Sequence, residues 1–251
     1  MRAGDGGWSM IVTIDGPAGA GKSTVARLLA ERLGFRFLDT GAMYRVVALA
    51  ALRRGLAGDD ACGWVDLARR IEMRFEGRRV FLDGEDVSDA IRASHVTAHV
   101  RYAADNPQVR EHLVELQQAI GRAGNMVTEG RDQGTIVFPH AECKVFLTAS
   151  PAERARRRVD DLQRRGETPE FAAVLAEQRT RDERDANRPV GPLVKAPDAV
   201  EVVTDGLSLD DVVSRLAELV DTHLPGRPPC LNKAGFDTAR PDTPRPDTAA
   251  S

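Results

Sequence analysis

The eight residues from Gly16 to Ser23 are the feature that most restricts the fold of this chain. They spell GPAGAGKS, with the spacing G-x-x-x-x-G-K-S, and they stand between the apolar run 10–15 and a segment whose apolar residues recur at three- and four-residue steps. A strand, a glycine-rich loop and a helix in this order surround a phosphate with backbone N–H groups. The sequence therefore predicts an α/β fold with an anion site at this loop.

The loop also indicates how a nucleoside triphosphate would be held. Its glycines carry no Cβ, so the backbone can turn its N–H groups inward. Lys22 would bridge the β- and γ-phosphates of ATP, and Ser23 would bind Mg²⁺. No N-K-x-D motif follows a late strand, which argues against a GTPase. The predicted ATP-binding residues are Gly16, Pro17, Ala18, Gly19, Ala20, Gly21, Lys22, Ser23 and Thr24.

The rest of the chain alternates short β-branched runs with amphipathic segments, which is typical of a parallel sheet covered by helices. We expect strands at 10–15, 35–39, 125–130, 143–149 and 199–205, and helices over 23–33, 42–54, 107–122, 152–165 and 208–224. The predicted fold class is α/β: a five-stranded parallel sheet as the P-loop core, with flanking helices, a small antiparallel β insertion and an Arg-rich helical lid.

Other segments set the expected domain boundaries. Residues 71–92 predict two or three short strands with turns at Glu76-Gly77 and Asp83-Gly84, within an insertion of about residues 63–100. We expect one domain over 10–224, with its lid at about 152–170. Residues 1–9 are expected to be flexible, and the Pro-rich residues 225–251 to be disordered.

Charge and cysteine content argue against several classes of protein. The 35 Lys and Arg residues nearly balance 38 Asp and Glu residues, so no overall field favours nucleic acid or an anionic membrane. The three cysteines are far apart and odd in number, which argues against a disulfide framework and a zinc site. No apolar run approaches the ~18 residues of a membrane span. We expect a soluble, cytoplasmic protein.

Polar residues follow two further predicted strands, at the edge where open α/β sheets bind ligands. The segment LDTGAMYR supplies Thr40, Tyr44 and Arg45. The segment TEGRDQGT supplies Glu129, Arg131 and Asp132. A carboxylate here could hold Mg²⁺ and an adjacent arginine could clamp a phosphate, whereas plain solvated surface is the alternative for both segments.

Two charged segments complete the candidate site. Residues 152–166 contain Arg154, Arg156, Arg157 and Arg158. They could close as a lid over the transferred phosphate and neutralise its charge, or they could form a solvated helix face. Residues 179–189 place Arg181, Asp185 and Arg188 on one helical face, where they could pair internally or bind a polar ligand.

Four blocks together, IDGPAGAGKST, LDTGAMYR, EGRDQGT and RDERDANRP, resemble the bacterial cytidylate kinase family of P-loop nucleoside monophosphate kinases, over roughly residues 10 to 220. The resemblance implies a monomer that phosphorylates CMP and dCMP with ATP and Mg²⁺. It implies catalysis by Lys22, Arg131, Arg154, Arg157 and Arg158, and metal binding by Ser23 and Glu129. The acceptor would be held by Thr40, Tyr44, Arg45, Arg110, Arg131, Asp132, Arg181, Asp185 and Arg188.

Three positions depart from the pattern of that family. Glu129 replaces an aspartate, Gln133 replaces an apolar residue, and Arg101 stands where a small hydroxyl residue near the base is common. An arginine at 101 could fill part of the base pocket or turn aside, so UMP remains an alternative acceptor. A P-loop regulatory module that binds ATP without turnover is the alternative of a different class.

Overall fold

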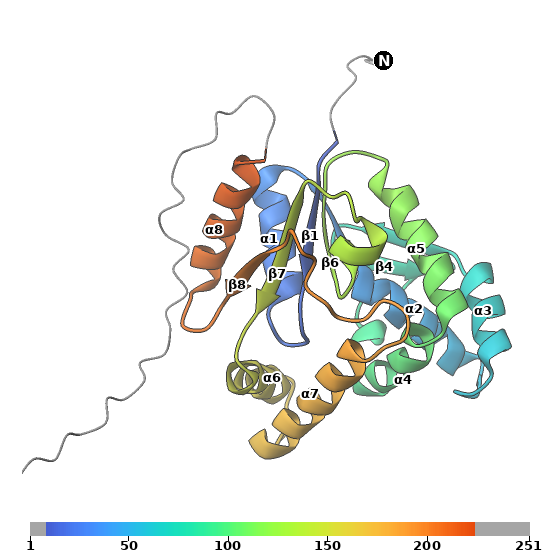
Figure 1. The fold of residues 1–251 in the computed structure, drawn as a ribbon. Coiled ribbons are helices and arrows are strands. Elements are labelled where there is room, and N and C mark those ends of the chain that lie inside the picture. Colours follow the sequence, from blue (N-terminus) through green and yellow to red (C-terminus); the bar gives the residue numbers. More distant parts are fainter. Residues whose placement is uncertain (1–8, 224–251) are drawn as a thin grey trace, which may run out of the picture.

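A five-stranded parallel sheet is the centre of the computed structural model, which describes residues 9–223 (Figure 1). The strands are β1 (Ile11–Asp15), β2 (Arg36–Asp39), β6 (Met126–Gly130), β7 (Cys143–Thr148) and β8 (Val200–Val203), in the order β2-β6-β1-β7-β8. All their pairings are parallel. The predicted sheet is confirmed. The sequence predicts a flexible segment 1–9 and a disordered segment 225–251. Residues 1–8 and 224–251 lie outside the described residues.

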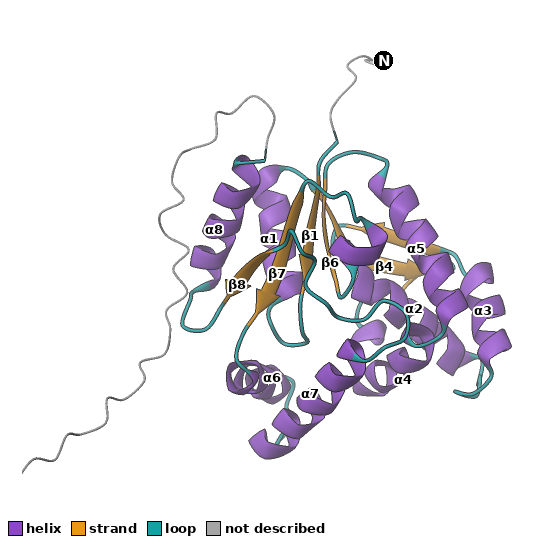
Figure 2. Cartoon of the chain, in the orientation of Figure 1, coloured by secondary structure: helices purple, strands orange, loops and turns teal. Residues whose placement is uncertain are grey.

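Helices cover both faces of this sheet (Figure 2). On one face lie α1 (Lys22–Leu33) and α8 (Leu209–Asp221), whose apolar sides share a core with β1 and β7. The other face carries a larger core built by α2 (Thr40–Arg53), α3 (Ala61–Arg70), α4 (Ser94–Ala104) and α5 (Pro107–Gly121). No helix within residues 9–223 is long and apolar enough to cross a membrane.

The predicted antiparallel insertion forms three short strands, β3 (Met73–Glu76), β4 (Arg79–Leu82) and β5 (Glu85–Asp86). A 3-10 turn, η1 (Ala90–Arg92), follows them. The flanking helices α3 and α4 were not predicted, because Gly63 interrupts one and the other contains β-branched residues of low helix propensity. Their helical state is stabilised by burial, since Trp64 is only 1% exposed and Val96 is fully buried.

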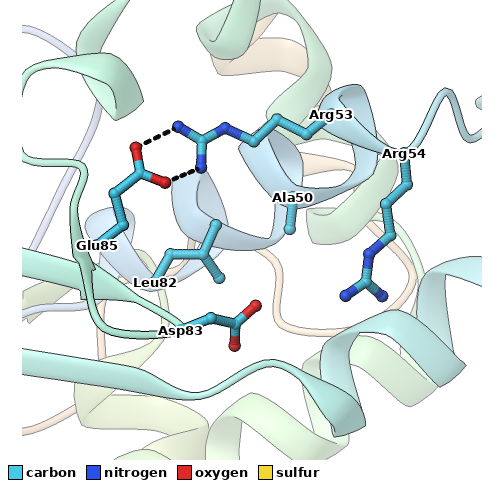
Figure 3. Close-up of a pocket in the computed structure, with 6 residues that line it drawn as sticks. All are labelled: Ala50, Arg53, Arg54, Leu82, Asp83 and Glu85. Atoms are coloured by element: carbon cyan, nitrogen blue, oxygen red, sulfur yellow. Dashed lines mark hydrogen bonds and ion pairs between the residues drawn. The ribbon is translucent and has the colours of Figure 1, made fainter.

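The insertion is fixed to the end of α2 beside a cavity of about 150 Å³ (Figure 3). Arg53 donates to both carboxylate oxygens of Glu85, at 2.7 and 2.8 Å. Ala50 and Leu82 contribute apolar surface to the same cavity. The helix that carries Thr40, Tyr44 and Arg45 near its start therefore holds the insertion at its other end.

The predicted lid is the first helix of a hairpin that lies beyond the carboxyl ends of the strands (Figure 1). The lid hairpin consists of α6 (Pro151–Arg164) and α7 (Phe171–Ala186), which enclose a small core of their own. Ser150 caps α6 by accepting from the backbone N–H of Glu153, and Pro151 follows at the first helical position. Because α7 ends at Ala186, Arg188 lies just beyond the helix rather than on its face as predicted.

Candidate active site

The predicted phosphate loop joins β1 to α1 and depends on glycines with positive φ. Gly21 caps α1 with φ 88°. Gly16 passes so close to β7 that a Cβ there would overlap the carbonyl oxygen of Leu147. Lys22 Nζ donates to the carbonyl of Pro17 at 2.8 Å. The lysine and the free N–H groups at the start of α1 therefore face the same loop, where they can bind an anion.

Lys22 lies among other cations. Burial, followed by the charge of Arg131, lowers the pKa of Lys22 to about 7. Burial and Arg131 likewise lower the pKa of Arg181 to about 10. Burial also lowers the pKa of Arg45, and the nearby Arg92 and Arg158 lower it further. A group of mutually repelling cations in one site favours a bound polyanion.

Two carboxylates face this group of cations. Asp39 and Glu129 are direct neighbours in the pairing of β2 with β6. Glu129 Oε1 accepts from the hydroxyl of Ser23 at 2.9 Å, and its backbone carbonyl accepts from Thr40 Oγ1 at 2.6 Å. Burial, and then the charge of Glu129, raises the pKa of Asp39 to about 7. Two adjacent carboxylates and a hydroxyl form an oxygen donor set that fits Mg²⁺.

Asp185 of α7 holds three arginines together. Its carboxylate is 3.0 Å from Arg131 Nε, 2.7 Å from Arg188 Nη2 and 3.9 Å from Arg181 Nε. Although burial raises the pKa of Asp185, the nearby Arg131 and Arg181 lower it below its usual value overall. Arg188 also pairs with Asp105 at the end of α4, at 3.1 Å. This cluster joins the lid hairpin to β6 and α4.

A second buried pair lies beside that cluster. Arg110 of α5 donates to the carboxylate of Asp132, and both side chains are less than 8% exposed. The guanidinium of Arg110 lies 5.6 Å from the ring centroid of Tyr44. Burial raises the pKa of Tyr44 to about 12, so its hydroxyl remains a hydrogen-bond donor at neutral pH. Asp132, Arg110 and Tyr44 thus lie together next to the Asp185 cluster.

Arg45 connects α2 with α4 and the insertion. Its Nη1 donates to Thr97 Oγ1 at 2.6 Å and to the carbonyl of Ile91 at 3.3 Å. Arg158 of α6 lies close enough for its charge to affect Arg45, yet within residues 9–223 it has no hydrogen bond or ion pair. Arg158 is therefore available to an anion.

The other three arginines of this part of α6 form hydrogen bonds or ion pairs. Arg154 donates to the carbonyls of Ala18 and Ala149, at 3.0 and 3.1 Å. Arg157 donates to the hydroxyl and the carbonyl of Thr204, both at 2.9 Å. Arg156 is exposed and pairs only with Glu153 among the described residues, as a solvated helix face would. The lid helix is therefore docked on the phosphate loop by Arg154 and on the end of β8 by Arg157.

The comparisons with known proteins agree with this geometry. A family model described as cytidylate kinase matches residues 12–222. The chain belongs to the cytidylate kinase family. A cytidylate kinase of Rhodopirellula baltica is 50% identical over 211 residues, covering 84% of this chain and 92% of that protein. One of Symbiobacterium thermophilum is 46% identical over 217 residues, covering 84% and 96%. The predicted family is confirmed.

Two of the positions that depart from the cytidylate kinase pattern, Arg101 and Gln133, make their side-chain contacts outside the Asp185 cluster. Arg101 is exposed, donates to Tyr102 Oη at 2.7 Å, and lies 4.7 Å from the centroid of that ring. Gln133 is buried and bonds to Gln117 and Thr128, at 3.0 and 2.9 Å. In this structure Arg101 has turned aside.

Sequence reasoning missed several acids of this cytidylate kinase site. Asp15 accepts from the backbone N–H groups of Gln133 and Gly134, at 2.8 and 2.7 Å, and so ties β1 to the π-helical turn η2 (Gln133–Val137). Burial raises the pKa of Asp15 to about 6. Asp39 and Asp182 were also missed. The available signal was that β1 and β2 each end on an aspartate at the ligand-binding edge.

Proposed function

We propose that this chain transfers the γ-phosphoryl group of ATP to CMP or dCMP, which yields ADP and CDP or dCDP. As a cytidylate kinase, it is a phosphotransferase with a phosphate group as acceptor. One observation supports a site with an ATP side and an acceptor side. Lys22 and Arg154 contact the phosphate loop, whereas Arg131 and Arg181 contact Asp185 of α7. Phosphates from two nucleotides would meet between these pairs of cations.

The donor nucleotide would bind at the loop. Backbone N–H groups of residues 16–24 would surround the β- and γ-phosphates, and Lys22 would leave the carbonyl of Pro17 to bridge them. Arg158 would neutralise charge on the transferred group from the lid, since it has no other partner within residues 9–223. Arg154 and Arg157 would support it from the same helix.

Ser23, Glu129 and Asp39 would hold Mg²⁺, because their oxygens lie together beside the loop. When bound there, the ion would neutralise negative charge on the phosphates of ATP. Glu129 already reaches the Ser23 hydroxyl at 2.9 Å, so the longer side chain suits the role that the sequence assigns to it. Burial, and then the charge of Glu129, raises the pKa of Asp39, and a cation bound between the two carboxylates would lower it.

The acceptor would lie on the far side of Glu129. Arg45 and Arg131 would hold the acceptor phosphate as charged hydrogen-bond donors. Cytosine offers an amine donor beside two acceptors, so a carboxylate with neighbouring guanidinium groups complements it. The residues proposed for the base, the sugar and the remaining phosphate contacts are Thr40, Tyr44, Arg110, Asp132, Arg181, Asp185 and Arg188.

The reaction would proceed by in-line attack of an acceptor phosphate oxygen on the γ-phosphorus, with ADP as the leaving group. The acceptor phosphate has a second pKa of about 6, so it is largely a dianion at neutral pH and needs no strong general base. The protein would contribute position and positive charge. The lid hairpin would exclude water, which limits hydrolysis of ATP.

We further infer from the family resemblance that the protein acts on these small molecules as a monomer in the cytoplasm. The inference that nucleic acid is not a partner rests on the nearly balanced charge, a formal net of -3. UMP is the competing acceptor, and the two residues that suggest it are Arg101 and Gln133.

A coupled assay of ADP release tests this function. Purified protein with ATP and Mg²⁺ is offered CMP, dCMP, UMP or AMP separately. We expect turnover with CMP and dCMP at a kcat/KM at least about tenfold above that with UMP. Preference for UMP would overturn the base assignment. Nucleotide binding without any diphosphate product would favour a regulatory module instead.

A further inference from the structure

Asp182 of α7 lies at the contact between the lid hairpin and the phosphate loop. Its Oδ2 is 2.7 Å from Arg154 Nη1, and the same Nη1 donates to the carbonyl of Ala18 at 3.0 Å. The side chain of Arg154 is only 6% exposed. A buried guanidinium needs a counter-charge as well as carbonyl acceptors. Within residues 9–223, Asp182 is the carboxylate that pairs with Arg154.

A second contact reaches the loop from the same face of α7. Gln178 lies one helical turn before Asp182, and its Nε2 donates to the backbone carbonyl of Arg154 at 3.1 Å. A Cβ on Gly19 would lie 3.0 Å from Gln178 Nε2 and 3.1 Å from Arg154 Cβ. The face of α7 formed by Gln178 and Asp182 therefore holds Arg154 from two sides, directly above Gly19.

The Asp182 carboxylate uses only one of its two oxygens in the pair with Arg154. Its Oδ1 is buried and has no hydrogen-bond partner within the described part of the chain. An unsatisfied buried oxygen is costly, so the carboxylate stands here at some cost to stability. A carboxylate does, however, hold a guanidinium more strongly than a neutral carbonyl does, because the two groups carry opposite charges.

We propose that Asp182 is a positioning residue for ATP: through Arg154 it sets the shape of the phosphate loop and the place of the lid arginines. It does not touch the nucleotide. Asp185, three residues further along α7, pairs with Arg131 and Arg188 on the acceptor side. One helix thus carries one carboxylate for each nucleotide. This inference rests on the proposed function, because it takes the loop as the ATP site.

Steady-state kinetics of Asp182→Asn test the proposal. The substitution keeps the shape of the side chain and removes its charge. We expect KM for ATP to rise about tenfold, with KM for CMP changed less than about twofold. Glu183→Gln is the matched control, because Glu183 is the exposed neighbouring acid on the same helix. It should leave both KM values unchanged.

A double-mutant cycle shows whether Asp182 acts through Arg154. Arg154→Lys keeps a positive charge but removes the planar group that Asp182 orients. In that background Asp182→Asn should add less than about a twofold further rise in KM for ATP. Thermal unfolding of each variant identifies any loss of the fold, and Asp182→Glu should restore part of the ATP affinity.

Three results would overturn the inference, two of them from the single variant and one from the double-mutant cycle. The first is an unchanged KM for ATP in folded Asp182→Asn, and the second is an equal rise in KM for both nucleotides. The third, a full effect of Asp182→Asn in the Arg154→Lys background, would show that Asp182 acts by another route. Failure of the proposed function is distinguishable, because the unmodified protein would then make no CDP from CMP.

Discussion

Phosphate binding at the loop should be coupled to proton uptake by Lys22. Burial and Arg131 lower the pKa of this lysine to about 7, and a bound polyphosphate would return it towards the ordinary lysine value of about 10.4. These two pKa values determine the direction in which nucleotide affinity changes with pH. Above neutral pH the free protein holds a largely neutral Lys22, so binding must take up a proton, and affinity for the nucleotide falls as pH rises.

The magnitude follows from the same shift. At about pH 8 a group with a pKa of about 7 is roughly one-tenth protonated, so binding should take up about 0.9 proton. Affinity should fall about fivefold between about pH 7 and 8. It should then fall about tenfold over the next unit, a loss of about 1.4 kcal/mol. Asp15, with a pKa of about 6, is already ionised over this range and contributes little.

Titration calorimetry measures this uptake when ATP without Mg²⁺ is bound in two buffers of different ionisation enthalpy. Omitting the metal keeps Asp39 from adding a proton release of its own. Lys22→Arg is the matched control, because a guanidinium stays charged throughout and should take up no proton. The reasoning is refuted if the unmodified protein takes up no proton near pH 8, or if Lys22→Arg shows the same pH dependence.

Two further predictions test individual residues. Arg101→Ala should change KM for CMP less than about twofold, since the guanidinium is held on Tyr102; a larger rise in the coupled assay would place Arg101 in the base pocket. Gly16→Ala should lower the free energy of unfolding by about 2–4 kcal/mol in urea titrations, because its Cβ would overlap Leu147. Gly34→Ala is the control: its φ is also positive, but no atom lies within 4 Å of the added Cβ, so an equal loss there would contradict the steric argument.

The fold could be predicted well because its strongest signals are local. Short apolar runs, β-branched in four of the five strands, predict the sheet, and Ser150-Pro151 and Ser208 mark the starts of α6 and α8. The same reasoning failed for α3, which Gly63 interrupts, and for α4, which contains β-branched residues of low helix propensity. Their helices depend on burying Trp64 and Val96 against the rest of the core. Such a tertiary effect is not visible in a short window of sequence.

The sequence placed the arginines of the candidate site and three of its acids, Glu129, Asp132 and Asp185, but it did not single out Asp15, Asp39 or Asp182. Arg131, Arg181 and Arg188 were placed by their motifs, and Asp185 brings them together. Asp39 was missed because its importance comes from strand order: β6 pairs between β2 and β1, which puts Glu129 beside a residue ninety positions earlier in the chain. Asp182 looked like one of several acids in a charged helix, and only the docking of α7 on α6 brings it to Arg154.

The three departures from the family pattern bear on different parts of the reaction. Glu129 reaches the Ser23 hydroxyl, so its extra length acts on the donor side. Gln133 is committed to Gln117 and Thr128 in the interior, and its backbone N–H is held by Asp15. Arg101 is held on an exposed ring. Within residues 9–223 none of these side chains pairs with Asp185, which pairs with Arg181 and Arg188 on the proposed acceptor side. Discrimination between cytosine and uracil should therefore depend on the Asp185 cluster.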